Sequence, residues 1–225
     1  MATKDRLEFL PQALRCFLAQ TYTQSELIVV DDGRRSARHL CADLPRVRYI
    51  RLTTPANVGT KLNIGVEAAR GELLQKLDDD DYYHPDFLRL AVAHHPRRVA
   101  RRTVVAWCCF LICLRGDPRL RFSGHGWKPG GSLSFHRELW LRRPFRDIPL
   151  SEDSWFLRDH QPRIVRVCAG DHYMVVRHGR NTWHEMWGAP SADEYFRQLP
   201  ACGRTLGTVV TPDSLPFYQA LTRPV

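Results

Sequence analysis

Hydrophobic and polar positions alternate in two ways along the first half of the chain. Apolar residues at helical spacing, with Gly71 placed to end the last segment, predict helices over residues 7–20, 34–42 and 60–70. Short β-rich or alternating runs predict strands over residues 26–30, 47–52 and 72–77. Strands that alternate with helices predict a largely parallel sheet with helices on its faces.

The second half is less regular. Strands are predicted over residues 104–114, 132–135, 164–168 and 173–177, and helices over 138–141, 151–159 and 192–199. We expect Ser151 to cap its helix, residues 119–131 to be irregular, and proline-punctuated coil to follow residue 199. No internal repeat or low-complexity linker divides the chain. The pattern therefore predicts one domain over residues 1–188 in two halves, 1–100 and 101–188, with a helical and coil extension over 189–225.

Composition narrows the class of protein. The chain has 225 residues, of which 44% are hydrophobic and 25% charged, so it is not a disordered chain. The net charge of +9 suits an anionic ligand, nucleic acid or an anionic membrane surface. Apart from the closely spaced arginines at 97–98 and 101–102, the basic residues are scattered singly or in pairs, and no nucleic-acid motif accompanies them. We therefore expect no nucleic-acid partner.

The seven cysteines and the apolar runs indicate the compartment. The cysteine count is odd and no CxxC pair or zinc-like spacing occurs, which predicts buried free thiols in a reducing cytoplasm. No signal peptide is visible, and the longest apolar run, 104–114, is too short to span a bilayer. The sequence thus predicts a cytoplasmic protein and leaves a position at the inner face of the membrane, with peripheral attachment, open.

Four consecutive carboxylates, Asp78, Asp79, Asp80 and Asp81, are the strongest chemical signal. They follow a predicted buried strand, and ligands of α/β sheets usually bind at strand ends. Adjacent carboxylates repel one another, and a hard divalent cation such as Mg²⁺ or Mn²⁺ would relieve that repulsion. The alternative is a solvated acidic turn.

Further motifs stand in a fixed order around this tetrad. They are Asp31-Asp32-Gly33 after an early strand, Asn57-Val58-Gly59 before a helix with Lys61 and Asn63, then Gly130-Gly131 and Glu152-Asp153. Together with the tetrad, they make residues 2–184 resemble the family 2 glycosyltransferases. The resemblance implies the GT-A (Rossmann-like) α/β fold, a mixed, mostly parallel central sheet flanked by helices. It also implies a nucleotide-binding half and an acceptor half.

The resemblance implies a site for a nucleotide-sugar donor and a divalent metal, Mn²⁺ or Mg²⁺. Either Asp31 or Asp32 would contact the base. Asp80 would ligate the metal, Asp78 would reach the ribose or the metal, and His178, or alternatively His184, would complete the metal site. Asp79 ranks lower because side chains alternate along an extended segment. The expected donor-binding residues are Thr3, Asp5, Asp31, Asp32, Asn57, Gly59, Lys61, Asn63, Asp78, Asp79, Gly130 and Gly131.

The resemblance also implies catalytic roles for Asp153, as general base, and for its neighbour Glu152. One base with in-line displacement predicts inversion at the anomeric carbon. The donor would be a UDP-sugar, and the acceptor a glycan, a lipid-linked sugar or a small molecule. From the residues alone, Glu152 and Asp153 equally suit the first turn of a helix.

Several neighbouring residues keep two interpretations. Gly130 and Gly131 would admit a sugar closely or form a hairpin turn. Trp127 and Trp155 would stack on a sugar or pack in the core. Lys61 would bind the donor or lie on a solvated helix face. Near the end of the predicted strand 173–177, Arg177 or Arg180 is expected to pair with diphosphate oxygens.

Two features depart from the family pattern. Met1 stands almost at the end of the first expected strand, so most of that strand is missing from the sequence. The Gln-x-x-Arg-Trp segment of processive synthases is absent, which predicts a single sugar addition. The second hypothesis is therefore a non-catalytic relative that binds a nucleotide or a partner.

Overall fold

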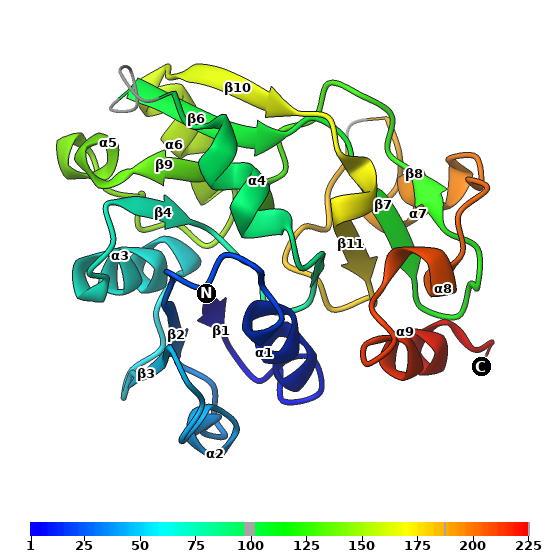
Figure 1. Cartoon of the computed structure of the whole chain (residues 1–225), viewed down its shortest axis with the longest axis horizontal. Helices are drawn as coiled ribbons and strands as arrows, with labels where there is room; N and C mark the ends of the chain where they lie inside the picture. The colour runs from blue at the N-terminus through cyan, green and yellow to red at the C-terminus, as the bar shows by residue number, and fades with distance from the viewer. Residues whose placement is uncertain (97–101, 187, 225) are drawn as a thin grey trace.

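The computed structural model describes residues 1–96, 102–186 and 188–224. Arg97, Arg98 and Arg101 of the two basic pairs lie outside these ranges. Within them the strands form three hydrogen-bonded sheets with helices packed around them (Figure 1). The prediction of an α/β chain with a mixed sheet is confirmed, with parallel pairing throughout the first sheet and both kinds of pairing in the other two.

The first sheet has the order β1-β2-β3, and all its strands are parallel. Every residue of β2 is buried, as expected for the middle strand of a covered parallel sheet. Its strands are β1 (Ala2–Thr3), β2 (Leu27–Asp31) and β3 (Val47–Arg51), and the helices that connect and cover them are α1 (Leu10–Leu18), α2 (Arg38–Cys41) and α3 (Val58–Ala68).

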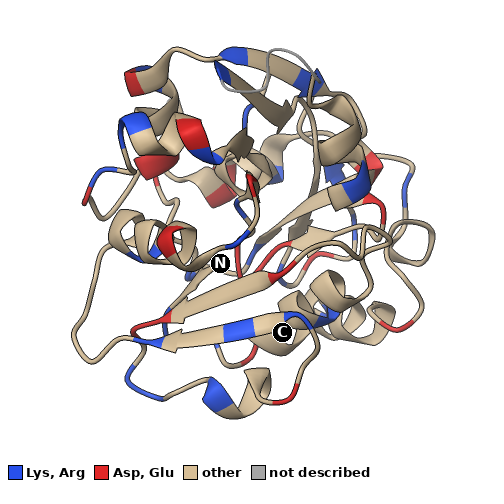
Figure 2. Cartoon of the chain, turned by 60° about the vertical axis from the view of Figure 1, so that its left-hand side comes forward, with Lys and Arg blue, Asp and Glu red and all other residues tan. Residues whose placement is uncertain are grey.

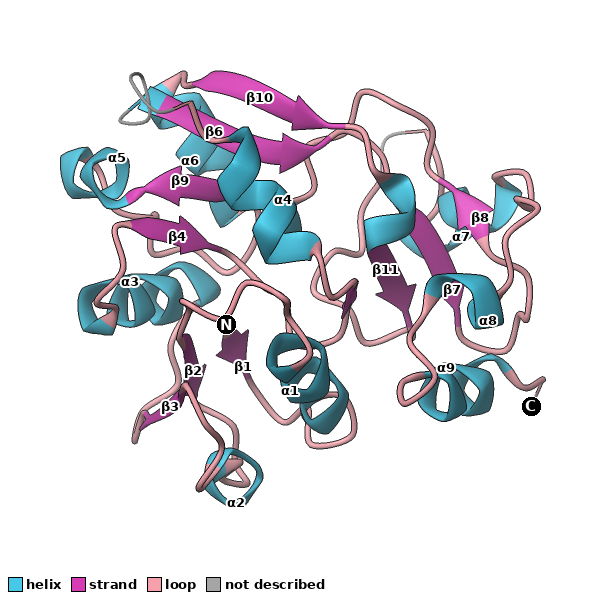
Figure 3. Cartoon of the chain, in the orientation of Figure 1, coloured by secondary structure: helices cyan, strands magenta, loops and turns pink. Residues whose placement is uncertain are grey.

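The second sheet, of order β10-β6-β9-β4, is covered on both faces (Figure 3). Along β6, Val104 and Ala106 point into one apolar cluster with Phe156 of α6, whereas Val105 and Trp107 point into the cluster that includes α4. This alternation is the two-residue period of a strand. The elements are β4 (Leu73–Gln75), β6 (Thr103–Trp107), β9 (Ser134–His136), β10 (Arg163–Val167), α4 (Phe87–His94), α5 (Arg137–Arg142) and α6 (Glu152–His160).

The third sheet has the order β5-β11-β7-β8. The prediction of one strand over residues 104–114 is wrong, because this run forms β6 and β7 in different sheets. Residues 108–110 between them are as buried as the strands, so hydrophobicity gave no sign of the break. The strands are β5 (Tyr82–Tyr83), β7 (Leu111–Leu114), β8 (Arg121–Phe122) and β11 (Tyr173–Arg177).

The C-terminal segment is helical, and the predicted coil after residue 199 is wrong. Its buried side chains, including Phe196, Val209 and Tyr218, belong to the main apolar cluster of the molecule. Gln12 of α1 also donates a hydrogen bond to Ser214 at 2.8 Å. None of the helices in the described ranges is long and apolar enough to cross a bilayer. The helices are α7 (Ala192–Gln198), α8 (Leu206–Val209) and α9 (Leu215–Thr222).

Two local predictions also need correction. Ser151 does not cap α6 through its side chain; it has a left-handed backbone, with φ of 63°. Cys108 and Cys168 form a disulfide, so the expectation of free thiols is wrong for this pair. The two cysteines follow the paired residues Trp107 and Val167 of the parallel strands β6 and β10, which brings them together. The other cysteines are free, and all but Cys202 are buried.

Candidate active site

A cavity of about 820 Å³ collects most of the residues singled out in the sequence. Acidic and basic segments lie close together around the N-terminus (Figure 2), and residues 2–6 form part of the cavity wall. The cavity is lined by residues 2–6, 56–58, 61, 76, 78–81, 127–131, 149–154, 173, 175, 177 and 180–185. Segments remote in sequence, and both halves of the chain, thus meet at one place.

A larger cavity, of about 1030 Å³, lies between β2 and β4. Its wall includes Leu27 and Ile28 of β2, beyond the two residues of β2 that pair with β1, and Leu73 and Leu74 of β4. Neither the acidic tetrad nor Asp153 lines it. We therefore place the candidate active site in the smaller cavity, where the titratable groups converge.

The tetrad is not a solvated acidic turn. Asp79 and Asp81 are only 7% and 5% exposed, while Asp78 and Asp80 are half-buried. Asp81 accepts hydrogen bonds from the Tyr173 hydroxyl at 2.6 Å and the Val176 amide at 3.0 Å. Burial, with the charges of Asp80 and Asp78, still raises the pKa of Asp81 well above its usual value.

Asp79 shows that the negative charge of the tetrad is not fully compensated. One of its carboxylate oxygens is buried without a hydrogen-bond partner. Burial and the neighbouring charge of Asp80 raise the pKa of Asp79 to about 7. A buried carboxylate oxygen without a partner is costly in free energy. A further cation bound near Asp79 would therefore be electrostatically favourable.

Asp80 forms an ion pair with the Arg6 guanidinium. Its Oδ2 lies 2.5 Å from Arg6 Nη1, 3.0 Å from His178 Nε2 and 3.3 Å from Asn181 Nδ2. Burial alone would raise the pKa of Asp80, but His178 and Arg6 outweigh it and lower the pKa. His178 is 5% exposed and stacks on Phe9, which fixes its ring. His184, the alternative, is an exposed residue of the cavity wall.

The donor atoms around Asp80 are of the kinds that divalent cations take as ligands. Asp80 and His178 offer oxygen and nitrogen at one point, and Mg²⁺ commonly takes one or two carboxylates plus substrate phosphates. Asp78 does not join them, because its Oδ1 lies 3.0 Å from Lys76 Nζ. In the described part of the chain, the three do not form a cluster of ligand atoms within 4.8 Å of one another.

Both carboxylate oxygens of Asp31 accept hydrogen bonds from nearby residues. Its Oδ1 accepts the Gly33 amide at 2.7 Å, and its Oδ2 accepts the Ala37 amide at 3.0 Å and the Tyr49 hydroxyl at 2.6 Å. The Arg51 guanidinium lies 3.1 Å from the same oxygen. Asp31 is 1% exposed and shapes the turn, and neither Asp31 nor Asp32 lines the cavity. Asp32 is bonded to the lining residues Lys61 and Ala56, so it is the nearer candidate for the base.

Lys61 lines the cavity and forms a buried ion pair with Asp32. It is 4% exposed and donates to Asp32 Oδ1 at 2.7 Å and to the Thr3 carbonyl at 3.1 Å. Burial would raise the pKa of Asp32, but the Ala56 amide and Lys61 outweigh it and lower the pKa. The alternative of a solvated helix face for Lys61 is therefore wrong.

Asp5 and Asn57 also line the cavity. Asp5 Oδ1 accepts the Arg34 amide at 2.8 Å, and Asn57 donates to Asp147 at 3.0 Å. Each contact joins two segments that are far apart in the sequence.

Gly59 and Asn63 lie outside the cavity lining, contrary to prediction. A Cβ on Gly59 would stand 1.9 Å from the carbonyl oxygen of Arg146, so the glycine permits close backbone packing. Asn63 accepts the Trp140 indole N–H at 2.8 Å and the Phe145 amide at 2.9 Å. Both residues fix α3 against the segment that leads to α6.

Gly130 and Gly131 begin a short 3₁₀ turn, not a hairpin. A Cβ on Gly130 would stand 1.9 Å from Asp153 Oδ2, and one on Gly131 would stand 2.6 Å from Asp78 Oδ2. The room left by these glycines is taken by two carboxylates of the site. The turn therefore brings Asp153 and the tetrad to the same wall of the cavity.

Lys76 links the tetrad to the predicted catalytic pair and was missed in the sequence. Its ammonium lies 3.0 Å from Asp78 Oδ1 and 3.3 Å from Glu152 Oε1, with the side chain 8% exposed. Burial alone would lower the pKa of Lys76, but Asp78, Glu152 and Asp153 hold it well above its usual value. A lysine inside an apolar strand run was the available signal, because a buried ammonium needs partners.

Glu152 and Asp153 form the first turn of α6, as either interpretation requires. Glu152 is 6% exposed, and burial raises its pKa, although Lys76 opposes the shift. Asp153 is half-buried, lines the cavity, and accepts the Ser154 amide at 2.7 Å. The structure gives Glu152 a buried ion pair and leaves Asp153 facing the cavity.

The tryptophans take different positions. Trp127 lines the cavity, but its indole N–H donates to the Ser123 carbonyl at 2.9 Å and its ring packs among aromatic side chains. Trp155 is not part of the lining and lies against Arg146, 3.9 Å from the guanidinium. Trp183, which the sequence analysis did not single out, lines the cavity and is 37% exposed.

The two arginines also differ. Arg177 is buried and bound to Asp193 at 2.6 Å, so its charge is committed to α7. Arg180 is exposed in the cavity wall, where it pairs with Glu8. Arg6, another residue missed in the sequence, holds the Arg180 carbonyl at 2.7 Å and thereby joins the wall to Asp80.

Comparison with known proteins gives matches in sequence and in structure. The model of the family described as glycosyl transferase family 2 matches residues 1–122. A protein named as colanic acid biosynthesis glycosyl transferase WcaA, of Escherichia coli K12, is 29% identical over 111 residues. The match covers 47% of this chain and 40% of WcaA, so the chain spans less than half the length of this relative.

Two solved structures share the fold. TarS 1–349 of S. aureus, in complex with UDP-GlcNAc, gives a TM-score of 0.61 at 18% identity, over 80% of this chain and 58% of that one. The mannosyltransferase PcManGT of Pyrobaculum calidifontis, with GDP-Man and Mn²⁺, gives 0.59 at 18% identity, over 78% and 55%. The GT-A fold predicted from the sequence is confirmed by these likenesses.

Proposed function

Because the chain belongs to glycosyl transferase family 2, we propose that it moves a sugar from a nucleotide-diphospho-sugar to a hydroxyl group, with a divalent cation and with inversion at the anomeric carbon. The observation that carries the proposal is the shared cavity, where the tetrad, Lys61 and Asp153 line one space although they come from separate segments.

The donor lies along the wall made by residues 2–6 and the tetrad. Asp32, held by Lys61, is the candidate for the base, and we propose a uridine diphosphate donor, as in the TarS complex. Asp80 and His178 would hold the cation, either Mn²⁺ or Mg²⁺. When bound, it would supply Lewis-acid stabilisation of the departing diphosphate. Arg6 balances the charge of Asp80 in its absence.

Asp153 is the general base. It takes the proton of the acceptor hydroxyl as that oxygen attacks the anomeric carbon from the face opposite the diphosphate. The Gly130 turn holds the carboxylate in place, and Lys76 forms an ion pair with the neighbouring Glu152 at 3.3 Å. A single carboxylate at the reacting centre favours direct displacement over a covalent intermediate.

The acceptor enters past residues 180–185, which carry the exposed Trp183. An aromatic face at a cavity mouth suits the apolar face of a sugar ring. Since WcaA is named for colanic acid biosynthesis, we propose a glycan acceptor that receives one sugar per encounter.

A thermal-shift panel tests the donor site. UDP, GDP, CDP and TDP are each added with and without Mn²⁺. Stabilisation at saturating ligand should reach about 2–3 kcal/mol, since a ligand stabilises the state that it binds. We expect UDP with Mn²⁺ to give the largest shift, and Asp80→Asn to remove the metal-dependent part. The absence of any shift in a cooperatively melting protein would contradict the proposal.

A further inference from the structure

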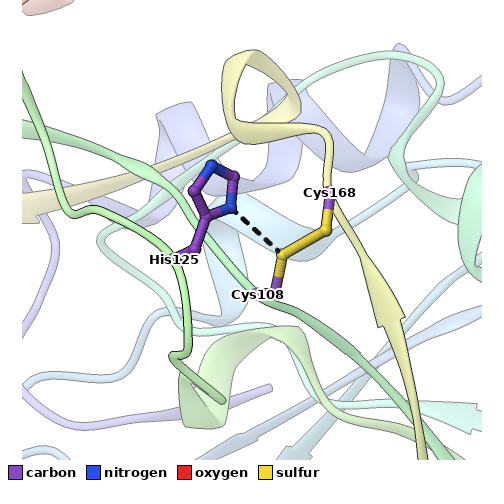
Figure 4. Close-up of side chains that lie close together, drawn as sticks. All are labelled: Cys108, His125 and Cys168. Atoms are coloured by element: carbon purple, nitrogen blue, oxygen red, sulfur yellow. Dashed lines mark hydrogen bonds between the residues drawn. A yellow bond between two sulfur atoms is a disulfide. The ribbon is translucent and has the colours of Figure 1, made fainter.

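A second group of reactive side chains lies outside the active-site lining. Cys108, His125 and Cys168 bring their sulfur and nitrogen atoms within 4.8 Å of one another. His125 Nδ1 is 3.7 Å from Cys108 Sγ, and the imidazole faces the sulfur pair (Figure 4). None of the three lines the 820 Å³ cavity. No proposed step of sugar transfer uses them.

The fold places these residues together through the ends of two strands. The amide of Cys108 donates to the Val167 carbonyl at 3.0 Å, which continues the parallel pairing of β6 and β10 by one residue. The Cα atoms of Cys108 and Cys168 are 5.5 Å apart. At this separation the sulfurs can bond to each other or, once reduced, turn toward a common ligand.

His125 is presented to the pair by a tight turn. The glycines on either side of it, Gly124 and Gly126, have φ of 74° and 101°, which residues with side chains rarely adopt. The ring also packs edge-on against Phe122, with centroids 5.5 Å apart. His125 and Cys168 are exposed, whereas Cys108 is buried, so the group is open to solvent on one side.

We propose that Cys108, Cys168 and His125 bind a zinc-class divalent cation when the disulfide is reduced. Two thiolates and one imidazole are a typical donor set for Zn²⁺, and three protein ligands leave the fourth position for water. The set has no carboxylate, so it selects a softer cation than the tetrad does. The disulfide form, in which the sulfurs are bonded to each other, excludes the ion.

Conversion of the disulfide form to the metal-binding form requires reduction and then deprotonation of both thiols. A dithiol reductant gives two electrons and two protons to the disulfide, the S–S bond breaks, and the reductant is oxidised to its own disulfide. Each thiol then loses its proton as the cation binds. Two thiolates and a neutral imidazole give a site that is neutral overall with the divalent ion.

The site has a structural connection to the sugar-transfer cavity. The Trp127 amide donates to the Cys108 carbonyl at 3.1 Å, and residues 127–131 continue into the cavity wall. A cation bound by His125 therefore fastens the start of this segment to the ends of β6 and β10.

A second cluster, His84, Asp86 and His172, is a weaker metal candidate. The Asp86 carboxylate is already paired with Arg89 at 2.9 Å and hydrogen-bonded by Thr21 at 2.7 Å. A cation there would compete with a guanidinium, so this cluster serves as a control.

The experiment titrates Co²⁺ into the reduced, reductant-free full chain under anaerobic conditions. Co²⁺ reports thiolate ligation by a sulfur-to-metal charge-transfer band, which Co²⁺ at the tetrad or at a histidine cluster lacks. We expect one equivalent to saturate the band, Zn²⁺ to abolish it, and the oxidised protein to show none. Zn²⁺ should also protect two thiols from a thiol reagent.

Matched variants locate the site. Cys168→Ser should lose the band. His125→Ala, at an exposed side chain, should weaken Co²⁺ binding at least tenfold. Cys202→Ser, at the other solvent-accessible cysteine, and His84→Ala should retain it. No thiolate band in the reduced wild type, or an undiminished band in Cys168→Ser, would overturn the proposal.

Discussion

Removing the charge of Lys76 tests the electrostatic core of the site. This ammonium is nearly enclosed and is shared between Asp78 Oδ1 at 3.0 Å and Glu152 Oε1 at 3.3 Å. The variant Lys76→Met keeps a chain of similar length and removes the charge. It leaves two carboxylates on the cavity wall without their common partner.

The contacts set the size of the effect. At an effective dielectric constant of about 20, each ion pair at this separation has a gross attraction of about 5 kcal/mol. The desolvation of the ammonium offsets much of it, and removal of one partner from a buried pair typically costs about 3–5 kcal/mol. Because Asp78 has a side chain 36% exposed, we expect the lower end, about 3 kcal/mol at pH 7.

Chemical denaturation at pH 7 measures the loss directly. Lys4→Met is the matched control, because Lys4 is 52% exposed and lies 3.9 Å from Asp32, so its loss should cost under about 1 kcal/mol. Adding Glu152→Gln to Lys76→Met should restore part of the stability. A loss below about 1 kcal/mol for Lys76→Met, or no restoration by Glu152→Gln, would show that Lys76 does not stabilise the fold through these ion pairs.

The pH dependence has a defined sign. Burial already raises the pKa of Glu152, and Lys76 opposes this shift. Without Lys76 the folded pKa rises further above the unfolded value of about 4.3. A carboxyl with a raised folded pKa stabilises the fold only while it is protonated, so stability is lost as pH rises through that pKa. The gap between wild type and Lys76→Met should therefore be smaller near pH 5 than near pH 8.

Two other changes follow from the geometry. Gly130→Ala should lower transfer at least tenfold while nucleotide stabilisation is retained, because a Cβ would stand 1.9 Å from Asp153 Oδ2. Gly203→Ala, at an open position, should match wild type in the same assay. Equal transfer rates for both variants would contradict this role of Gly130. Asp117→Asn should cost about 1–2 kcal/mol at pH 7, because the hydrogen bond from Arg119 lowers the pKa of Asp117 to about 2. Urea denaturation should show this gap closing as pH falls from about 4 to 2, and a constant gap would refute it.

Periodicity predicted most elements, and it failed where burial was uniform or local signals conflicted. The buried run over 104–114 gave no sign of the turn that separates β6 from β7. In the C-terminal segment, prolines suggested coil, yet Pro216 lies in the first turn of α9, where proline is tolerated. The disulfide was missed because its cysteines are 60 residues apart and meet only through the pairing of β6 with β10.

The candidate site was partly predictable for a similar reason. Motif order identified the tetrad, Lys61 and Asp153, which the structure gathers at one cavity. It also included Gly59 and Asn63, whose contacts are with the segment before α6. Partners such as Arg6 and Lys76 belong to no motif, and only tertiary structure shows which carboxylates they neutralise.

Sugar transfer, as we propose it, requires Asp153 to remove the proton of the acceptor hydroxyl. The most direct measurement compares sugar transfer and nucleotide binding in wild type and Asp153→Asn, with Mn²⁺ and the preferred donor from the thermal-shift panel. We expect transfer to fall by about 10²–10⁴-fold while the nucleotide-induced thermal shift is retained. Transfer at the wild-type rate in Asp153→Asn would contradict it.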